Sequence, residues 1–117
     1  MGHIRQDVSI KGKKPANVRM LVDTGATFSV IPKALARELG IAPSRHSMMV
    51  TLADGRRRRW PFGLALFRIG DREVGSTLLV GDVAEPILGV ETLEALGLAV
   101  DPRKGRLIPT RSYTVRV

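Results

Sequence analysis

Two segments of the sequence resemble each other at a constant spacing of 57 residues, and this spacing constrains the fold more than any other feature. Residues 30–41 resemble residues 87–98, and both segments end in Leu-Gly followed by an apolar residue. The same spacing places residues 20–22 on residues 77–79. Each half would then hold a strand, a loop, a short strand and a helix. A Leu-Gly pair can also recur by chance, because glycine commonly ends helices. The combined match of strand, apolar doublet and helix end favours a true repeat.

The two halves differ where their first long strand ends. Asp23 follows this strand in the first half, and Val80 takes the equivalent place in the second half. The repeat therefore predicts one carboxylate per chain at this position.

Alternating apolar residues and turn residues predict short β-strands, with two short helices. We expect Pro32 to be the first residue of a helix that runs to Leu39, because its missing N–H would be unpaired there anyway. Gly40 and Gly97 can end the two helices in a left-handed conformation. The expected strands cover residues 8–10, 18–22, 28–31, 48–53, 56–60, 62–69, 74–80 and 106–108, with a second helix over 91–96 and a strand or tail after Pro109.

A hairpin is expected around Asp54-Gly55, because this pair is among the best two-residue turns. Such a turn needs a positive φ at both positions. Side chains alternate between the faces of a hairpin, so about half of the arginines at 56–59 would point away from any cleft beneath it. These arginines could be a solvated edge that discourages aggregation, or they could dock an anionic partner. The two-residue turn would pair Ala53 with Arg56, Leu52 with Arg57 and Val50 with Arg59.

The composition is that of one globular domain over residues 1–117. With 44% hydrophobic residues, the chain can bury a modest core. It has no cysteine, which excludes disulfides and thiolate metal sites. There is no apolar run long enough to cross a membrane and no secretory signal after Met1. We therefore expect a cytoplasmic protein with no membrane partner.

The excess of positive charge raises the possibility of a nucleic-acid partner. The chain has 19 Lys and Arg against 11 acids, for a formal charge of +8. However, only the run at 56–59 is dense, and the chain has one Trp, one Tyr and three Phe. Single-strand binders need several stacking aromatics among their basic residues. The composition therefore disfavours nucleic acid as the main partner.

The sharpest local pattern is Leu-Val-Asp-Thr-Gly-Ala-Thr over residues 21–27. Two apolar strand residues precede an acid, a hydroxyl and a glycine. Gly25 lets the backbone turn tightly, and N–H groups freed in such a turn can point at the Asp23 carboxylate. Thr24 could hydrogen-bond to a neighbouring copy of the same loop. Taken alone, the motif is more typical of an Asx-type turn in which Asp23 caps its own backbone.

The order of the motifs resembles the retropepsin-like aspartic proteases, the family of retroviral proteases and their cellular relatives. Residues 21–27 match its Asp-Thr-Gly motif, and residues 87–89, Ile-Leu-Gly, match the apolar-apolar-Gly element before its C-terminal helix. Between them, the hairpin at Asp54-Gly55 stands where the family places its flap. The resemblance covers residues 18–108, and residues 29–32, 85–89 and 96–98 are similar to the small prokaryotic members.

The resemblance implies an all-β closed barrel that works as a homodimer and cleaves a peptide or protein substrate. Each chain would supply one carboxylate, that of Asp23, to a pair that shares one proton. The ionised carboxylate would take a proton from a water, and the protonated one would polarise the scissile carbonyl. Thr24 would brace the pair, and Gly25 would let it form. The expected substrate-binding residues are Ala26, Leu52, Ala53, Asp54, Gly55 and Ile87.

The flap departs from the retroviral pattern, since its tip is followed by four arginines rather than by further glycines. These arginines could favour acidic side chains in a substrate. Trp60 is expected to pack the base of the flap or the core, with a place over the substrate as the alternative. Asp82 lies near the equivalent loop of the second half, but it lacks a following Thr-Gly, and we interpret it as a surface acid.

Two other classes of function stay open. One is a catalytically silent dimeric module of the same fold that binds peptides. The other is a basic nucleic-acid-binding β-domain, whose affinity would fall steeply with salt and depend on the arginines at 56–59. No cofactor and no metal is expected, because His3 and His46 lack convergent ligands.

Overall fold

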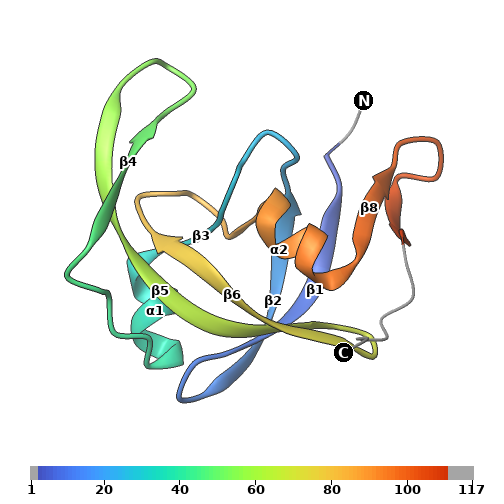
Figure 1. Cartoon of the computed structure of the whole chain (residues 1–117), viewed down its shortest axis with the longest axis horizontal. Coiled ribbons are helices and arrows are strands. Elements are labelled where there is room, and N and C mark those ends of the chain that lie inside the picture. The colour runs from blue at the N-terminus through green and yellow to red at the C-terminus, as the bar shows by residue number, and fades with distance from the viewer. Residues whose placement is uncertain (1–2, 111–117) are drawn as a thin grey trace, which may run out of the picture.

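The computed structural model describes residues 3–110, which are mostly β-strand with two short helices, as the sequence predicts. No helix in this part of the chain is long and apolar enough to cross a bilayer. The elements in chain order are β1 (Arg5–Lys11), β2 (Pro15–Val22), β3 (Ser29–Ile31), α1 (Lys33–Leu39), β4 (Ser47–Thr51), β5 (Arg57–Ile69), β6 (Arg72–Val80), β7 (Ile87–Leu88), α2 (Val90–Leu96), β8 (Leu98–Asp101) and β9 (Arg106–Pro109) (Figure 1).

Six strands of the main sheet pair in a closed ring. Their order is β1-β2-β7-β3-β6-β5, and β5 returns to β1, where Ile10 pairs with Phe67. Closure removes the free edges that an open sheet would expose. β4 pairs only with the first part of β5, so this hairpin extends beyond the ring (Figure 1). The pairings agree with the closed all-β domain expected from the motifs.

The hydrophobic core fills the ring. Side chains alternate along the strands, so every second residue points inward. β5 shows the alternation most clearly, because Ala65 and Phe67 are buried while Leu64 and Leu66 are exposed. Both helices contribute buried apolar residues to this core. The residues that are no more than 3% exposed include Val8, Ile10, Met20, Ile31, Ala36, Leu39, Phe67, Leu78, Val80, Leu88, Leu93 and Leu96.

The repeat of 57 residues is present in the secondary structure. β2, β3 and α1 recur as β6, β7 and α2, and the two helices have the same length at the same spacing. Both helices end at a left-handed glycine, Gly40 with φ 67° and Gly97 with φ 69°, as predicted. The halves exchange strands, because β2 pairs in parallel with β7 and β3 pairs in parallel with β6. Each half therefore completes the sheet of the other.

Two predicted boundaries were wrong. The first helix begins at Lys33, and Pro32 stands just before it with an extended backbone, ψ 155°. The strands expected on either side of Pro61 form one continuous strand, β5. This strand changes partner at the proline, because Pro61 faces Ser47 of β4 and Phe62 faces Leu79 of β6. A residue without an N–H is tolerated at such a position because the ladder is interrupted there.

The β4–β5 hairpin turns differently from the prediction. Its loop has three residues, 53–55, since the Leu52 N–H donates to the Arg56 carbonyl (2.8 Å) and the Gly55 N–H donates to the Leu52 carbonyl (2.9 Å). Only Gly55 has a positive φ, 87°. Asp54 instead accepts a hydrogen bond from the Arg56 backbone N–H (3.0 Å). The register is therefore shifted by one residue, pairing Met49 with Arg59, Val50 with Arg58 and Thr51 with Arg57.

Candidate active site

Asp23 stands at the end of β2 on a tight turn. The Gly25 N–H donates to Asp23 Oδ1 (2.9 Å), and the Ala26 N–H donates to the Asp23 carbonyl (3.1 Å). A Cβ on residue 25 would lie 3.2 Å from Asp23 Oδ1, so glycine leaves room for the carboxylate. The Asx-type turn considered for this motif is therefore present. It fixes the direction of the carboxylate rather than consuming it, because the second oxygen remains available.

The Asp23 turn is attached to the second half of the chain. The Asp23 N–H donates to the Leu88 carbonyl of β7 (3.1 Å). The Val90 N–H donates to the Ala26 carbonyl (2.8 Å), and the Glu91 N–H next to it donates to the Thr27 carbonyl (2.9 Å). The first N–H groups of a helix have no partner inside the helix, so α2 can offer them to this loop. The start of α2 thus sets the position of the Asp23 turn.

Gly89 permits this close contact between the halves. A Cβ on residue 89 would lie 2.4 Å from the Phe28 carbonyl carbon and 2.5 Å from its oxygen. The φ of Gly89 is −96°, so the requirement is space and not an unusual backbone conformation. This contact gives the Ile-Leu-Gly element of the sequence a physical reason.

A buried cluster of three hydroxyls lies beneath the turn. Ser29 Oγ lies 2.7 Å from Thr92 Oγ1, which lies 3.0 Å from Ser76 Oγ. The Gly89 N–H donates to Ser29 Oγ (3.0 Å). The cluster joins β3, α2 and β6, and the exposure of its residues is 9% or less. Sequence reasoning did not predict it, although a serine before the apolar pair of β3 was a signal that could have been followed.

A cleft of about 660 Å³ lies between the Asp23 turn and the β4–β5 hairpin. Both segments lie at the same end of the molecule (Figure 1). Of the residues expected at the site, Thr24, Asp54 and Gly55 do not line the cleft and are exposed. Those that do line it are Asp23, Gly25, Ala26, Leu52, Ala53 and Ile87.

The floor of the cleft is apolar. Trp60 is 8% exposed and packs with Val30 and Leu79. It faces Met48 across the hairpin, so it lies at the hairpin base, as expected. Gly81 lies directly against the indole ring, since a Cβ there would be 2.3 Å from it. The hairpin base is therefore packed against the second half of the chain.

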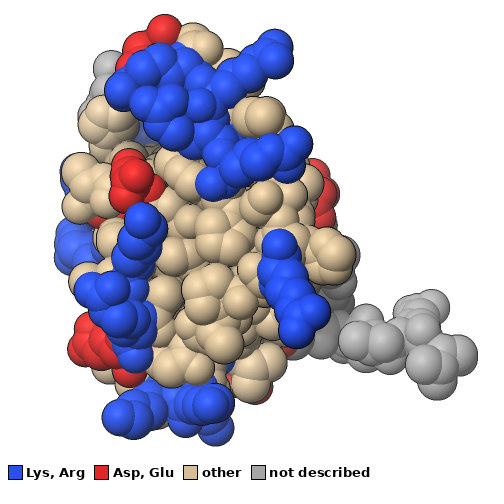
Figure 2. Space-filling model, turned by 90° about the vertical axis from the view of Figure 1, so that its left-hand side faces the viewer, with Lys and Arg blue, Asp and Glu red and all other residues tan. Residues whose placement is uncertain are grey.

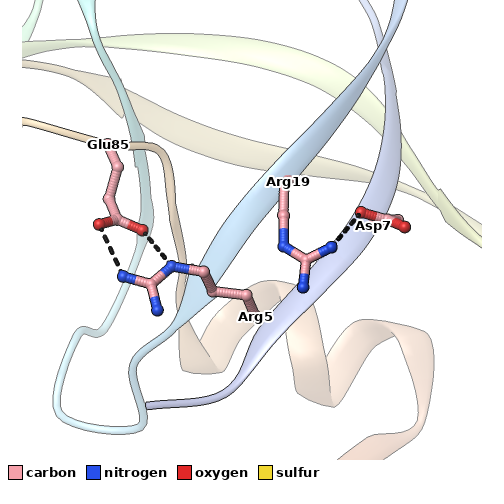
Figure 3. Close-up of polar contacts among 4 residues, drawn as sticks. All are labelled: Arg5, Asp7, Arg19 and Glu85. Atoms are coloured by element: carbon pink, nitrogen blue, oxygen red, sulfur yellow. Dashed lines mark hydrogen bonds and ion pairs between the residues drawn. The ribbon is translucent and has the colours of Figure 1, made fainter.

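Ion pairs tie strands together outside the cleft (Figure 3). Arg5 of β1 donates two hydrogen bonds to the Glu85 carboxylate, at 3.0 and 3.1 Å, and so joins the first strand to the segment before β7. The hydrogen bond from Arg5 holds the pKa of Glu85 below its ordinary value. A second pair, Arg19 with Asp7, joins β2 to β1 at 3.7 Å.

Other polar groups predicted from the sequence lie apart from the cleft or form no cluster. Asp82 is exposed and does not line the cleft. Between residues 3 and 110, no three His, Asp or Glu side chains lie close enough together to hold a metal ion.

Comparison with known proteins agrees with the family and the fold expected from the motifs. A family model described as aspartyl protease matches residues 7–92. An uncharacterized protein in the cobV 5′ region of Sinorhizobium sp. is 31% identical over 109 residues, which cover 86% of this chain and 46% of that protein. The chain thus spans about half the length of this curated relative.

The fold is similar to that of EIAV protease complexed with the inhibitor HBY-793. The TM-score is 0.69 at 21% identity, over 86% of this chain and 93% of that chain. This likeness confirms the retropepsin-like fold that the motifs predicted. The family model covers most of the chain, from β1 into α2, and includes both the Asp23 turn and β7. The chain therefore belongs to the aspartyl protease family.

Proposed function

We propose that this chain is an aspartic endopeptidase that acts as a homodimer, with Asp23 from each copy forming the catalytic pair. One observation carries the proposal: within residues 3–110, Asp23 is the only carboxylate that lines the cleft. Its equivalent in the second half, Val80, is 2% exposed and belongs to the core. A pair of carboxylates at this cleft therefore needs a second copy, related by a two-fold axis.

The reaction follows from two carboxylates that share one proton. The ionised carboxylate takes a proton from a water, whose oxygen attacks the carbonyl carbon of the peptide bond. The protonated carboxylate gives its proton to the carbonyl oxygen. The tetrahedral diol then breaks its C–N bond: the carboxylate that took the proton of the water gives it to the leaving nitrogen, and the other carboxylate takes a hydroxyl proton of the diol as the new carbonyl forms. The pair ends with the single proton with which it began.

The remaining predicted residues would bind the substrate or support the pair. An extended peptide would lie between the Asp23 turn and the β4–β5 hairpin, which would act as a flap. Backbone pairing would supply affinity and the apolar floor would supply side-chain pockets. Asp54 and Gly55 form the exposed tip of the hairpin and would close over the peptide. Thr24 is exposed beside Asp23 and would contact the equivalent loop of the second copy.

The first test is cleavage of a diverse peptide library, followed by mass spectrometry between mildly acidic and neutral pH. The key variant is Asp23→Asn, in which the amide oxygen can still accept the Gly25 N–H. Its loss of activity should be at least about a hundredfold. The matched control is Asp82→Asn, an exposed acid outside the cleft, which should cleave like the unaltered chain. Equal cleavage by Asp23→Asn at the same bonds would refute the proposal.

The dimer has a separate test. When unaltered chains are mixed with Asp23→Asn chains, a mixed dimer holds only one catalytic carboxylate. Activity should then fall as the square of the fraction of unaltered chains, and sedimentation should give the mass of a dimer. A linear fall would mean that one copy is sufficient. A folded dimer that cleaves nothing would support the silent peptide-binding module instead.

A further inference from the structure

We propose that Arg58 selects peptides that carry an acidic side chain two positions from an apolar side chain bound over Trp60. This inference deepens the proposed function and rests on it for the extended binding mode. It concerns recognition and not chemistry, so peptide binding can test it without cleavage.

The hairpin register places Arg58 on the same face of the hairpin as Trp60, next to Val50 of the cleft lining, although Arg58 itself does not line the cleft. Directly opposed residues of an antiparallel pair share a face, and successive residues alternate. Met48 faces Trp60 and Val50 faces Arg58. Met48 and Val50 pack on the cluster that contains Trp60, so this is the inner face of the hairpin. Arg58 therefore leaves the strand on the same face as Trp60, two residues closer to the tip.

The neighbouring arginines, Arg57 and Arg59, lie on the face of the hairpin opposite to Trp60. Arg57 faces Thr51 and Arg59 faces Met49, whose exposure is 47%. The register decides which arginine shares a face with Val50. The observed register pairs Val50 with Arg58, whereas a two-residue turn would have paired Val50 with Arg59. The chain thus supplies its own matched controls, two arginines on the same strand that point the other way.

Arg58 is available for a ligand, whereas Arg56 is already occupied. Arg56 Nε binds Asp54 Oδ2 at 2.6 Å, and this carboxylate also accepts the Arg56 backbone N–H. Arg58 Nη1 donates to the Arg57 carbonyl at 2.7 Å, and the other N–H groups of its guanidinium have no hydrogen-bond partner among the described residues. Within the described chain, Arg58 forms no ion pair with a carboxylate.

The surroundings favour an acidic peptide over a nucleic acid. Figure 2 shows Lys and Arg side chains gathered at the upper end of the face that carries the hairpin, above a largely uncharged area. The cleft is lined mostly by apolar residues, and Phe28 and Trp60 are the only aromatic residues among its described lining, fewer than the several stacking rings of a single-strand binder. An extended peptide has side chains on one face at every second residue. A bound peptide can therefore place an apolar side chain at Trp60 and a carboxylate at Arg58 together.

The binding assay uses the fluorescence of Trp60, the one tryptophan of the chain, in the Asp23→Asn background. The probes are short synthetic peptides with a single Leu, in pairs that differ only by Glu or Gln two positions from it. We expect Glu to bind about twofold to fivefold more tightly than Gln, the range for an exposed ion pair, and the preference to shrink with salt. Arg58→Ala should abolish the preference and Arg58→Glu should reverse it, while Arg57→Ala and Arg59→Ala should keep it.

Several outcomes would overturn the inference. The first is equal binding of the Glu and Gln peptides by the chain with Arg58 unaltered. The second is an equal loss of the Glu preference in Arg57→Ala and Arg58→Ala. The third is no binding of any of the peptides. Binding of a single-stranded oligonucleotide that weakens alike in all three alanine variants would point to a nucleic-acid partner instead. If the unaltered chain never cleaves peptides but the Glu preference depends on Arg58, the inference stands and the proposed catalysis fails.

Discussion

Replacing Ser29 by alanine removes a single hydroxyl group but should strongly destabilise the fold. The Ser29 side chain is fully buried between the two halves of the chain. Its oxygen accepts the Gly89 N–H at 3.0 Å and contacts the Thr92 hydroxyl at 2.7 Å. Alanine can make neither hydrogen bond. The start of α2 therefore loses a contact close to the residues that hold the Asp23 turn.

The expected cost has two parts. An unpaired buried N–H at Gly89 costs about 1–3 kcal/mol. Thr92 keeps Ser76 as a partner at 3.0 Å, so the loss there is only that of one ordinary hydrogen bond, about 1 kcal/mol or less. Together these give a loss of about 1–4 kcal/mol in the free energy of unfolding. That is a large share of the roughly 5–15 kcal/mol that holds a typical domain together.

Urea unfolding at one fixed protein concentration measures this loss, because the stability of a dimer depends on concentration. Ser9→Ala on β1 is the control, since this serine is only half-buried, and it should change the stability by less than about 0.5 kcal/mol. A double-mutant cycle of Ser29→Ala with Thr92→Val should give a coupling of about 0.5–1.5 kcal/mol. A loss below about 0.5 kcal/mol for Ser29→Ala, or strict additivity in the cycle, would refute the reasoning.

Two further predictions concern the attachment of the halves. Gly89→Ala places a Cβ 2.4 Å from the Phe28 backbone, so α2 must move away. We expect the free energy of unfolding to fall by about 3 kcal/mol or more. A urea unfolding curve like that of the unaltered chain would contradict the close contact. For the ion pair, hydrogen bonding to Arg5 lowers the pKa of Glu85, so the pair stabilises the fold above the ordinary glutamate pKa, and this contribution disappears as the pH falls through the lowered value. The difference in stability between the unaltered chain and Glu85→Gln, measured by urea unfolding, should therefore be present near about pH 7 and shrink as the pH falls below the ordinary glutamate pKa. A difference that does not depend on pH would exclude the pair as its source.

The helix ends and the repeat could be predicted because single residues decide them. Gly40 and Gly97 both take the left-handed conformation that ends a helix, and few other residues do so readily. Once two helices of equal length stand at one spacing, the preceding strands follow from the apolar pattern. The bend at Asp23 was equally local, since the Gly25 and Ala26 N–H groups both donate to Asp23 itself. Its attachment to β7 and α2 joins residues more than 60 positions apart and could not be read from the motif.

The hairpin register could not be predicted from its turn. Asp-Gly suits a two-residue turn, but it also suits a three-residue loop in which only Gly55 needs a positive φ. The core decides between them. The predicted register would set Trp60 opposite Met49, and a slip of one residue moves a strand's side chains to its other face. The observed register pairs Trp60 with Met48, which packs on the same cluster.

The hydroxyl cluster could not be predicted for a different reason. Ser29, Ser76 and Thr92 come from three different elements. The place of Ser29 before the apolar pair of β3 was a weak signal, but nothing local marks Ser76 and Thr92 as its partners. Their importance arises only when β3, β6 and α2 meet. Burial then turns an ordinary hydroxyl into a required partner, because an unpaired polar group in the core is costly.

In the second half of the chain, the residues equivalent to Asp23 and Thr24 have a structural role. Val80, which corresponds to Asp23, lies in the main core, and Gly81, which corresponds to Thr24, lies against the ring of Trp60. A carboxylate introduced at residue 80 would be buried without a partner, at a cost that would unfold a marginal domain. Residue 81 cannot carry a side chain unless the hairpin base moves. The features that shape the cleft within one copy thus prevent that copy from holding a second carboxylate, which is the physical argument for seeking the second one in a dimer.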